Sequence, residues 1–109
     1  MTRAEIYTML KSVGIPTAYH HFAENTGIQP PFICFYCPED NDFLADNTNY
    51  VKVDALTVEL YTDNKDFELE GRLEAALNGA GLVYTRFGEY IDSEKMYMQT
   101  YETEVLIDG

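Results

Sequence analysis

Apolar residues recur along this chain with two different periods, which predict where helices and strands lie. After Thr2-Arg3-Ala4-Glu5, the apolar positions 6, 9, 10 and 13 follow at helical spacing. Thr2 and Glu5 have the residue types and the spacing of a capping box, in which each side chain satisfies a backbone N–H of the first turn. Gly14 and Pro16 are typical of a helix end. The start of the chain therefore predicts a helix that ends before Pro16.

A second helical stripe occupies 62–81, in the middle of the chain. Asp63 or Asn64 is expected to cap its start, because a short polar side chain accepts a hydrogen bond from a free backbone N–H there. Either Gly79 or Gly81 is expected to end it. The apolar stripe consists of Leu69, Leu73, Ala76, Leu77 and Ala80.

Shorter apolar or alternating stretches predict strands on both sides of this helix. The segment "TAYHHF" (17–22) has the pattern of a possible short strand. The run "FICFYC" (32–37) is continuously apolar and lies between two prolines, which predicts a central strand covered on both faces. The segments 82–91 and 94–107 predict two strands joined by a hairpin at Asp92-Ser93.

The stretch 50–62 predicts a long strand whose apolar pattern changes phase. The apolar residues up to Ala55 have odd numbers, and those from Leu56 to Leu60 have even numbers. Since alternate residues of a strand point to opposite faces, one strand cannot keep both sets in the same core. Either a bulge near Ala55 or a strand that leaves the core to meet a partner would explain the change.

The order of these elements is helix, possible strand, strand, strand, helix, strand, strand. Runs of consecutive strands favour antiparallel pairing, so the order predicts an α+β fold, a mostly antiparallel sheet with two helices packed on one face. The chain has 109 residues, and 1–109 is expected to form a single domain.

The charge of the chain disfavours two classes of partner. It contains 7 Lys and Arg against 19 Asp and Glu, a net charge of −12. Phosphate backbones and anionic membrane surfaces repel such a chain, so we expect neither specific nucleic-acid binding nor a membrane partner. The excess of acidic residues lies after Tyr36, because in residues 1–36 the two basic residues Arg3 and Lys11 balance the two acidic residues Glu5 and Glu24. The near-neutral N-terminal third is therefore free to face a partner.

The segment from His20 to Cys37 raises the question of a metal site. It holds two histidines, His20 and His21, and two cysteines, Cys34 and Cys37, the residue types of structural zinc sites. In a strand, residues three apart point to opposite faces, so the two cysteines can neither share a metal ion nor form a disulfide. We expect both cysteines to be reduced and no metal to bind.

The acidic loop 38–49 also lacks a complete metal motif. Ala45 stands where a calcium loop requires glycine, and Val51 stands where it requires glutamate. We expect this loop to be mobile in the isolated protein and to be ordered by a partner.

No part of the sequence has a catalytic signature. No serine or cysteine lies in a nucleophile motif, and Gly79-Ala80-Gly81 follows a helix, whereas a phosphate-binding loop precedes one. We therefore expect a protein that is not an enzyme and that needs no cofactor.

Surplus apolar positions indicate protein contact instead. On the last predicted strand, Met96 and Met98 share a face with polar residues, and they need cover from another helix or from a neighbouring subunit. An exposed apolar patch usually marks a contact surface. With the phase change at 50–62, these positions predict a protein interface that includes Tyr50, Val51, Val53, Met96 and Met98.

Together these features resemble the small tail-completion, or tail-terminator, proteins of long-tailed (siphovirus-type) phages and prophages. The resemblance rests on "GIPTAYHHF" after the first helix, the strand "PPFICFYC", the strand-to-helix run "VDALTVELYTDNKDFELEGRLEAAL" and the closing hairpin "EYIDSEKMYMQTYETEVLI". It implies a virion structural protein that forms a ring, commonly a hexamer. Such a ring caps the tail tube and joins it to the head-tail connector.

The resemblance also implies partners and a location. The partners are further copies of the chain, the tail tube protein and the head-tail connector protein, and DNA passes through the ring without specific binding. Assembly takes place in the host cytoplasm, and the finished protein lies in the tail of the virion.

Two other classes of function remain open from the residues alone. An acidic protein-interaction module, such as an inhibitor or a nucleic-acid mimic, would stay monomeric and bind a basic partner, whereas a ring former self-associates. A protein that binds a small ligand in a tyrosine-lined pocket is the third class, since the chain contains nine Tyr residues.

Overall fold

The computed structural model describes residues 2–19, 28–36 and 52–107, and in the last of these segments the side chains of 55–105. The helices and strands follow the predicted order. They are α1 (Arg3–Lys11), β1 (Thr17–Tyr19), β2 (Phe32–Tyr36), β3 (Lys52–Thr62), α2 (Phe67–Gly79), β4 (Tyr84–Ile91) and β5 (Met96–Ile107).

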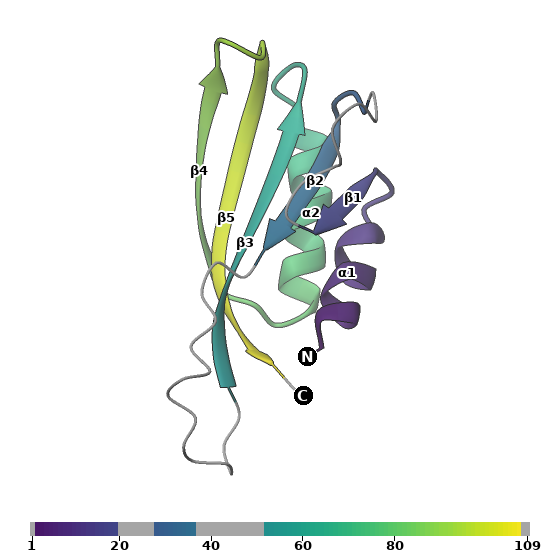
Figure 1. The fold of residues 1–109 in the computed structure, drawn as a ribbon, viewed down its shortest axis with the longest axis vertical. Coiled ribbons are helices and arrows are strands. Elements are labelled where there is room, and N and C mark those ends of the chain that lie inside the picture. Colours follow the sequence, from purple (N-terminus) through teal and green to yellow (C-terminus); the bar gives the residue numbers. More distant parts are fainter. Residues whose placement is uncertain (1, 20–27, 37–51, 108–109) are drawn as a thin grey trace.

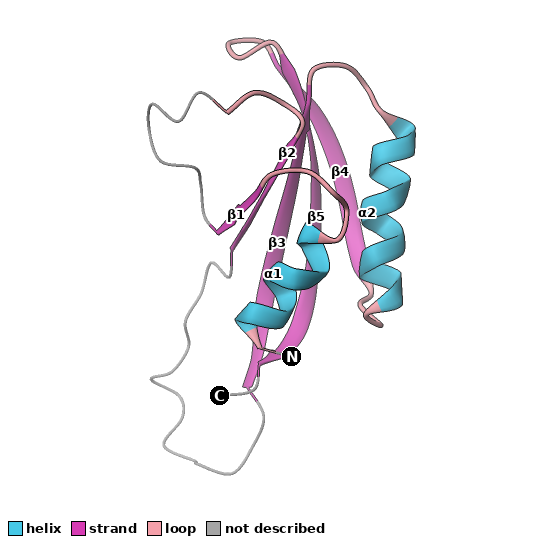
Figure 2. Ribbon diagram, turned by 90° about the vertical axis from the view of Figure 1, so that its right-hand side faces the viewer, coloured by secondary structure: helices cyan, strands magenta, loops and turns pink. Residues whose placement is uncertain are grey.

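The strands form one five-stranded sheet in the order β1-β2-β3-β5-β4 (Figure 1). The β1–β2 pair is parallel, and the other three pairs are antiparallel. Both helices lie on the same side of the sheet (Figure 2). The predicted α+β fold, with a mostly antiparallel sheet and two helices on one face, is confirmed.

The capping box of α1 is confirmed. The Glu5 backbone N–H donates to Thr2 Oγ1 at 3.1 Å, and the Thr2 backbone N–H donates to Glu5 Oε1 at 2.7 Å. The chain leaves the helix through Gly14, whose φ of 99° lies in the left-handed region that glycine adopts without strain. Local residue types are sufficient to set both ends of this helix.

The prediction for the start of α2 was wrong by two or three residues. Asp66, rather than Asp63 or Asn64, accepts the capping bond, at 3.0 Å from the backbone N–H of Leu69. The reason is that β3 continues to Thr62, so the next residues are needed to turn the chain before a helix can begin.

The end of α2 is a Schellman motif centred on Gly81. This glycine has a φ of 77°, and its N–H donates to the Asn78 carbonyl at 3.0 Å. The N–H of Leu82 donates to the Leu77 carbonyl at 3.1 Å, which completes the motif. Of the two glycines proposed for this end, Gly81 therefore provides the left-handed turn.

The pairing of β3 shows no bulge, so that explanation of the phase change was wrong. Its register with β5 runs without interruption from Lys52, opposite Ile107, to Thr62, opposite Tyr97. Strand β2 pairs only with residues 57–61 of β3. Residues 52–56 of β3 are thus paired only with β5 among the described strands, and they extend beyond the five-stranded part of the sheet (Figure 1).

The core lies between the helices and the face of the sheet toward them. Burying a leucine or isoleucine side chain contributes about 1.5–3 kcal/mol, so this cluster supplies most of the driving force for folding. Its members from the helices and the segment after α1 are Ile6, Leu10, Val13, Leu69, Leu73 and Leu77, and its members from the sheet are Ile33, Phe35, Leu56, Val58, Leu60, Tyr101 and Val105.

The apolar run at 32–37 forms an interior strand, although β3 takes the central place that was predicted for it. Ile33 and Phe35 are buried toward the helices, and Cys34 is a buried thiol on the other side. Cys37, His20, His21 and the loop 38–49 lie outside the described residues, so the absence of a metal site there stays a prediction. Among the described helices, none is long and apolar enough to cross a membrane.

Candidate protein-interaction face

The side of the sheet away from α1 and α2, called here the open face, is covered by neither of the described helices (Figure 2). Because side chains alternate along a strand, the register decides which residues lie on it. Val58 and its partner Tyr101 point into the core, so their neighbours Glu59 and Thr100 lie on the open face. The same alternation places Met96 and Met98 there.

One end of the open face is apolar. This apolar half lies toward the β4–β5 hairpin, where Ile91 pairs with Met96 and Tyr61 pairs with Met98. The rings of Phe32 and Tyr61 stack with centroids 4.8 Å apart and an interplanar angle of 21°. The apolar half consists of Phe32, Tyr61, Phe87, Ile91, Met96 and Met98, of which Phe87 is 49% exposed and the others are half-buried.

The two methionines that the sequence indicated therefore lie together, within a larger apolar surface. Two explanations for these methionines followed from the sequence, cover by another helix or by a neighbouring subunit. Within the described part of the chain, cover by a helix is wrong, because α1 and α2 both lie on the opposite side of the sheet. The predicted interface residues Tyr50 and Val51 lie outside the described residues, and Val53 lies in β3 at a position whose side chain is not described.

Sequence reasoning missed Phe32 and Tyr61 as members of this surface. The two residues come from segments far apart in the chain, and only the β2–β3 register places them opposite each other. The sequence did contain a signal for Phe32. In "FICFYC" it occupies an even-numbered position, so its side chain points away from the face that carries the core residues Ile33 and Phe35.

A carboxylate held by two tyrosines lies at the middle of the open face. Glu59 Oε1 accepts a hydrogen bond from the Tyr61 hydroxyl at 2.8 Å, and Glu59 Oε2 accepts one from the Tyr36 hydroxyl at 3.2 Å. Burial, and then the hydrogen bond to Glu59, raise the pKa of the Tyr61 hydroxyl far above its usual value. Tyr61 therefore keeps its proton, and its hydrogen bond to the carboxylate, further into the alkaline range than an ordinary tyrosine does.

The other end of the open face is acidic. In this acidic half, Glu102 lies between Thr57 and Thr85 across the sheet, and Glu104 lies beside Ala55. Both glutamates are exposed. No basic side chain lies on the open face among the side chains that the structure describes. The face thus carries most of its apolar side chains toward the hairpin end, where exposed Glu89 opposite Met98 is the one acidic residue among the described side chains of the apolar half, and it carries Glu102 and Glu104 at the opposite end.

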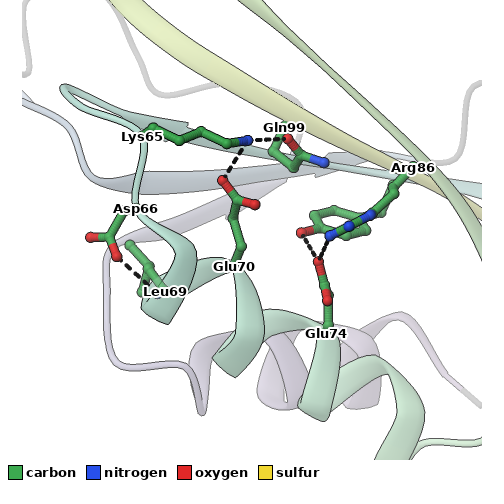
Figure 3. Close-up of polar contacts among 8 residues, drawn as sticks. Lys65, Asp66, Leu69, Glu70, Glu74, Arg86 and Gln99 are labelled. Carbon is green, nitrogen blue, oxygen red and sulfur yellow. Dashed lines mark hydrogen bonds and ion pairs between the residues drawn. The ribbon is translucent and has the colours of Figure 1, made fainter.

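Polar contacts on the helix side fix α2 against β4 and β5 (Figure 3). Glu74 of α2 pairs with Arg86 and accepts a 2.8 Å hydrogen bond from the Tyr101 hydroxyl. Burial and this bond raise the pKa of Tyr101 well above its usual value. The carboxylate of Glu74 is therefore a structural anchor that joins one helix to two strands.

A second contact on this side holds a buried acid. Glu70 is 5% exposed and pairs with Lys65 Nζ at 2.9 Å, and Lys65 also donates to Gln99 Oε1 at 3.2 Å (Figure 3). Glu70 is thus an acidic residue of α2 that is buried and whose charge is matched by Lys65. Gln99 reaches Lys65 across Gly88, where a Cβ atom would lie 2.5 Å from Gln99 Oε1.

A cleft of about 510 Å³ opens beside these residues, between the start of α2 and the β4–β5 hairpin. Tyr90 and Tyr97 line it, so it is the tyrosine-lined pocket of the small-ligand alternative. The charges of Lys65 and Glu70 in its wall are already paired with each other. Within the described part of the chain, no three His, Cys, Asp or Glu side chains gather as a metal site would require.

Comparison with known proteins gives a likeness in fold. No protein-family model matches the sequence, and no curated protein is similar to it in sequence. Among solved structures, the fold is similar to a chain of the "Virion of native gene transfer agent (GTA) particle", with a TM-score of 0.58 and 15% identity. The match covers 92% of this chain and 84% of that chain. At this identity the likeness establishes a shared fold.

Proposed function

We propose that this chain is a structural protein of a phage-like virion, and more specifically a tail-completion protein. In this proposal it caps the tail tube as a ring and joins the tube to the head-tail connector. The observation that carries the proposal is the apolar half of the open face, which neither described helix covers and which a monomer has no reason to expose. The fold shared with a chain of a gene transfer agent virion supports it.

The apolar half is the surface proposed to dock on the tail tube protein or the connector. Met96 and Met98 suit this role, because their flexible side chains adapt to an irregular partner surface. Phe32 and Tyr61 add aromatic rings that are already stacked before a partner arrives, so little side-chain freedom is lost on docking.

The acidic half is proposed to lie near the passing DNA. Binding a phosphate backbone requires Lys or Arg, and the described side chains of the open face include neither. With a net charge of −12 per chain, a ring would repel DNA rather than hold it. The proposal assigns the chain no catalytic residue and no cofactor, and it places the protein in the virion after assembly in the host cytoplasm.

Replacing both methionines by lysine tests the docking surface. The variant Met96→Lys/Met98→Lys is expected to fold, because both side chains are already half exposed, and to leave tails without heads in a complementation assay scored by electron microscopy. The variant Asn64→Lys/Asn78→Lys adds the same charge at two exposed positions away from the open face and is expected to complete tails normally. A methionine variant that unfolds, or that folds and still completes tails, overturns this docking surface.

The acidic half favours one second candidate, an acidic module that binds a basic protein. Exposed Glu102 and Glu104 are the observation behind it. Native mass spectrometry over a concentration series, with and without tail tube protein, separates the two. A tail-completion protein forms oligomers under at least one of these conditions, whereas a nucleic-acid mimic remains monomeric in both.

A further inference from the structure

Four of the six exposed large hydrophobic side chains among the described residues lie at the two lateral edges of the sheet, and the other two, Phe67 and Val83, lie at the start of α2 and just before β4. Tyr7 and Tyr19, 37% and 43% exposed, lie on α1 and on the edge strand β1. Phe87 and Tyr90, 49% and 46% exposed, lie on the other edge strand, β4. Figure 1 shows these two edges on opposite sides of the molecule. They are called here the first edge (Tyr7, Lys11, Tyr19) and the second edge (Phe87, Glu89, Tyr90).

The first edge is an ordered aromatic surface with a positive charge. The Tyr19 ring meets the buried Phe35 ring edge-on at 5.3 Å, and the Tyr7 ring lies 6.2 Å from Phe35. Lys11 Nζ lies 5.8 Å from the centre of the Tyr7 ring. Since Phe35 holds both tyrosines, their exposed surfaces are available without a large loss of side-chain freedom.

The second edge is a strand edge that is suited to pairing. β4 pairs with β5 in an uninterrupted register from Tyr84 to Ile91, without a bulge or a proline. Its outer side meets no other described strand. Long edge strands of this kind are templates for adding another strand, and natural proteins usually protect them.

The topology makes the two edges compatible in direction. β1 runs parallel to β2, and three antiparallel pairings then lead through β3 and β5 to β4. β4 therefore runs opposite to β1. When a rotation about an axis along the strands relates two copies, β1 of one copy meets β4 of the next in an antiparallel arrangement.

The two edges differ in the sign of their net charge. On α1, Arg3 and Lys11 outnumber Glu5 by one. On β4 and the hairpin that follows, Glu89, Asp92 and Glu94 outnumber Arg86 and Lys95 by one. Opposite net charges favour contact between unlike edges over contact between two like edges.

We propose that the first edge of one copy docks on the second edge of the next copy, with β1 added antiparallel to β4. This inference rests on the proposed ring and names the surfaces that close it. The contact is head-to-tail, so a closing rotation generates a ring. Pairing of two β4 edges would leave Tyr7 and Tyr19 exposed, whereas the head-to-tail contact brings both together with Tyr90, which lies on the same, helix side of the sheet. It also leaves the open face accessible to tube and connector.

Cysteine cross-linking tests the arrangement without a particle. Tyr19 and Tyr90 both lie on the helix side of the sheet, so cysteines at these positions approach each other across the proposed contact. Two variants, Tyr19→Cys and Tyr90→Cys, are made in a Cys34→Ala/Cys37→Ala background and treated with a short bismaleimide, alone and as a mixture. The expected result is a dimer band several-fold stronger in the mixture than in either variant alone.

The controls make the result decisive. Asn78→Cys, exposed at the end of α2, replaces Tyr90→Cys in a matched mixture and is expected to give no dimer above background. A dimer formed by Tyr90→Cys alone means that two β4 edges pair symmetrically, which overturns the proposal. Equal, background-level cross-linking in every sample, over a concentration series and with tail tube protein present, also overturns it.

Charge reversal provides a second test that keeps the native aromatic residues. Lys11→Glu and Glu89→Lys should each weaken self-association, because each gives the two edges net charges of the same sign; Glu89 lies on the open face and does not pair directly with Lys11. Mixing the two variants should restore self-association, since every contact again joins opposite charges. A mixture that assembles no better than its components contradicts the inference. If the charge-reversal test fails but the protein still completes tails, the edge contact is wrong and the proposed virion role stands. If the edges cross-link as expected but the protein does not complete tails, the virion role is wrong and the edge contact stands.

Discussion

The hydroxyl of Tyr61 donates a 2.8 Å hydrogen bond to Glu59, which lies two residues earlier on the same strand and the same face. The ring of the same tyrosine stacks on Phe32 from β2. One side chain thus links the carboxylate at the middle of the open face to the apolar half. The surface proposed for docking is ordered by contacts within the chain itself, before any partner binds.

Tyr61→Phe should lower the free energy of unfolding by about 1 kcal/mol. The substitution keeps the stacked ring and removes the donor to a half-buried carboxylate, and hydrogen bonds of this kind contribute about that amount. Urea unfolding followed by circular dichroism measures the change. Tyr90→Phe removes an exposed hydroxyl and should change stability much less, and equal losses in both variants would contradict the role given to the Glu59 bond.

Stability should fall at alkaline pH because of Tyr61 and Tyr101. In the folded chain, burial and hydrogen bonds to Glu59 and Glu74 raise both pKa values above the ordinary 10.0. The two groups therefore ionise first in the unfolded chain, which binds fewer protons than the folded chain above that pH. Their contribution is complete below about pH 10 and is lost as the pH rises further.

Urea titrations at a series of pH values from neutral to strongly alkaline measure this decline. Tyr101→Phe lacks one of the two groups, so its free energy of unfolding should decline less steeply above about pH 10. The slopes are compared rather than the absolute stabilities, because the substitution also removes a hydrogen bond. Identical slopes for the variant and the native protein would show that Tyr101 ionises normally in the folded chain.

Gly88→Ala should destabilise the fold by about 1–3 kcal/mol, the usual cost of placing an extra group in a filled space. A Cβ atom at this position would lie 2.5 Å from Gln99 Oε1, so Gln99 would have to move away from Lys65. Thermal unfolding measures the effect. The double variant Gly88→Ala/Gln99→Ser should recover part of the loss, because the shorter side chain frees the space.

Gly71 provides the matched control for that substitution. It lies inside α2, and a Cβ there would meet nothing within 4 Å. Gly71→Ala should therefore stabilise the protein by about 0.5–1 kcal/mol through helix propensity. If both alanine variants changed stability in the same direction, the tight contact between Gly88 and Gln99 would not be the cause.

Phe32→Ala should weaken docking without unfolding the chain. Its ring lies on the open face and stacks on Tyr61, outside the core between the helices and the sheet. Co-sedimentation with tail tubes should show less bound protein than for the native chain at equal concentration. Phe67→Ala removes an exposed ring at the start of α2, away from the open face and from both edges, and should leave tube binding unchanged, and comparable losses in the two variants would place docking elsewhere.

Features that depend on neighbouring residues were predictable from the sequence. The capping box at Thr2 and Glu5 needs only two side chains three residues apart, and it forms as expected. The order of helices and strands follows from local periodicity in the same way. The end of β3 at Thr62 was predicted, but the cap of α2 was misplaced because Asp63, Asn64 and Asp66 are all capping residue types, and the sequence does not show that residues 63–65 form the turn.

Features that depend on register were not predictable. The alternation of apolar residues in 50–62 does not reveal that the pairing of β2 with β3 ends at Thr57. The change in alternation therefore suggested a bulge, which the continuous register between β3 and β5 excludes. Met96 and Met98 could be identified from the sequence because they are apolar residues on the otherwise polar face of their own strand. Phe32 and Tyr61, which complete the same surface, required the pairing of distant strands.

Immunogold electron microscopy of purified particles that carry this chain tests the virion role most directly. An antibody raised against the purified protein is applied to whole particles and to detached tails. The account predicts gold at one end of the tail tube, where the tube meets the head, and label at the same end of detached tails. Label along the whole tube, on the head surface alone, or only in the soluble fraction of the lysate would contradict it.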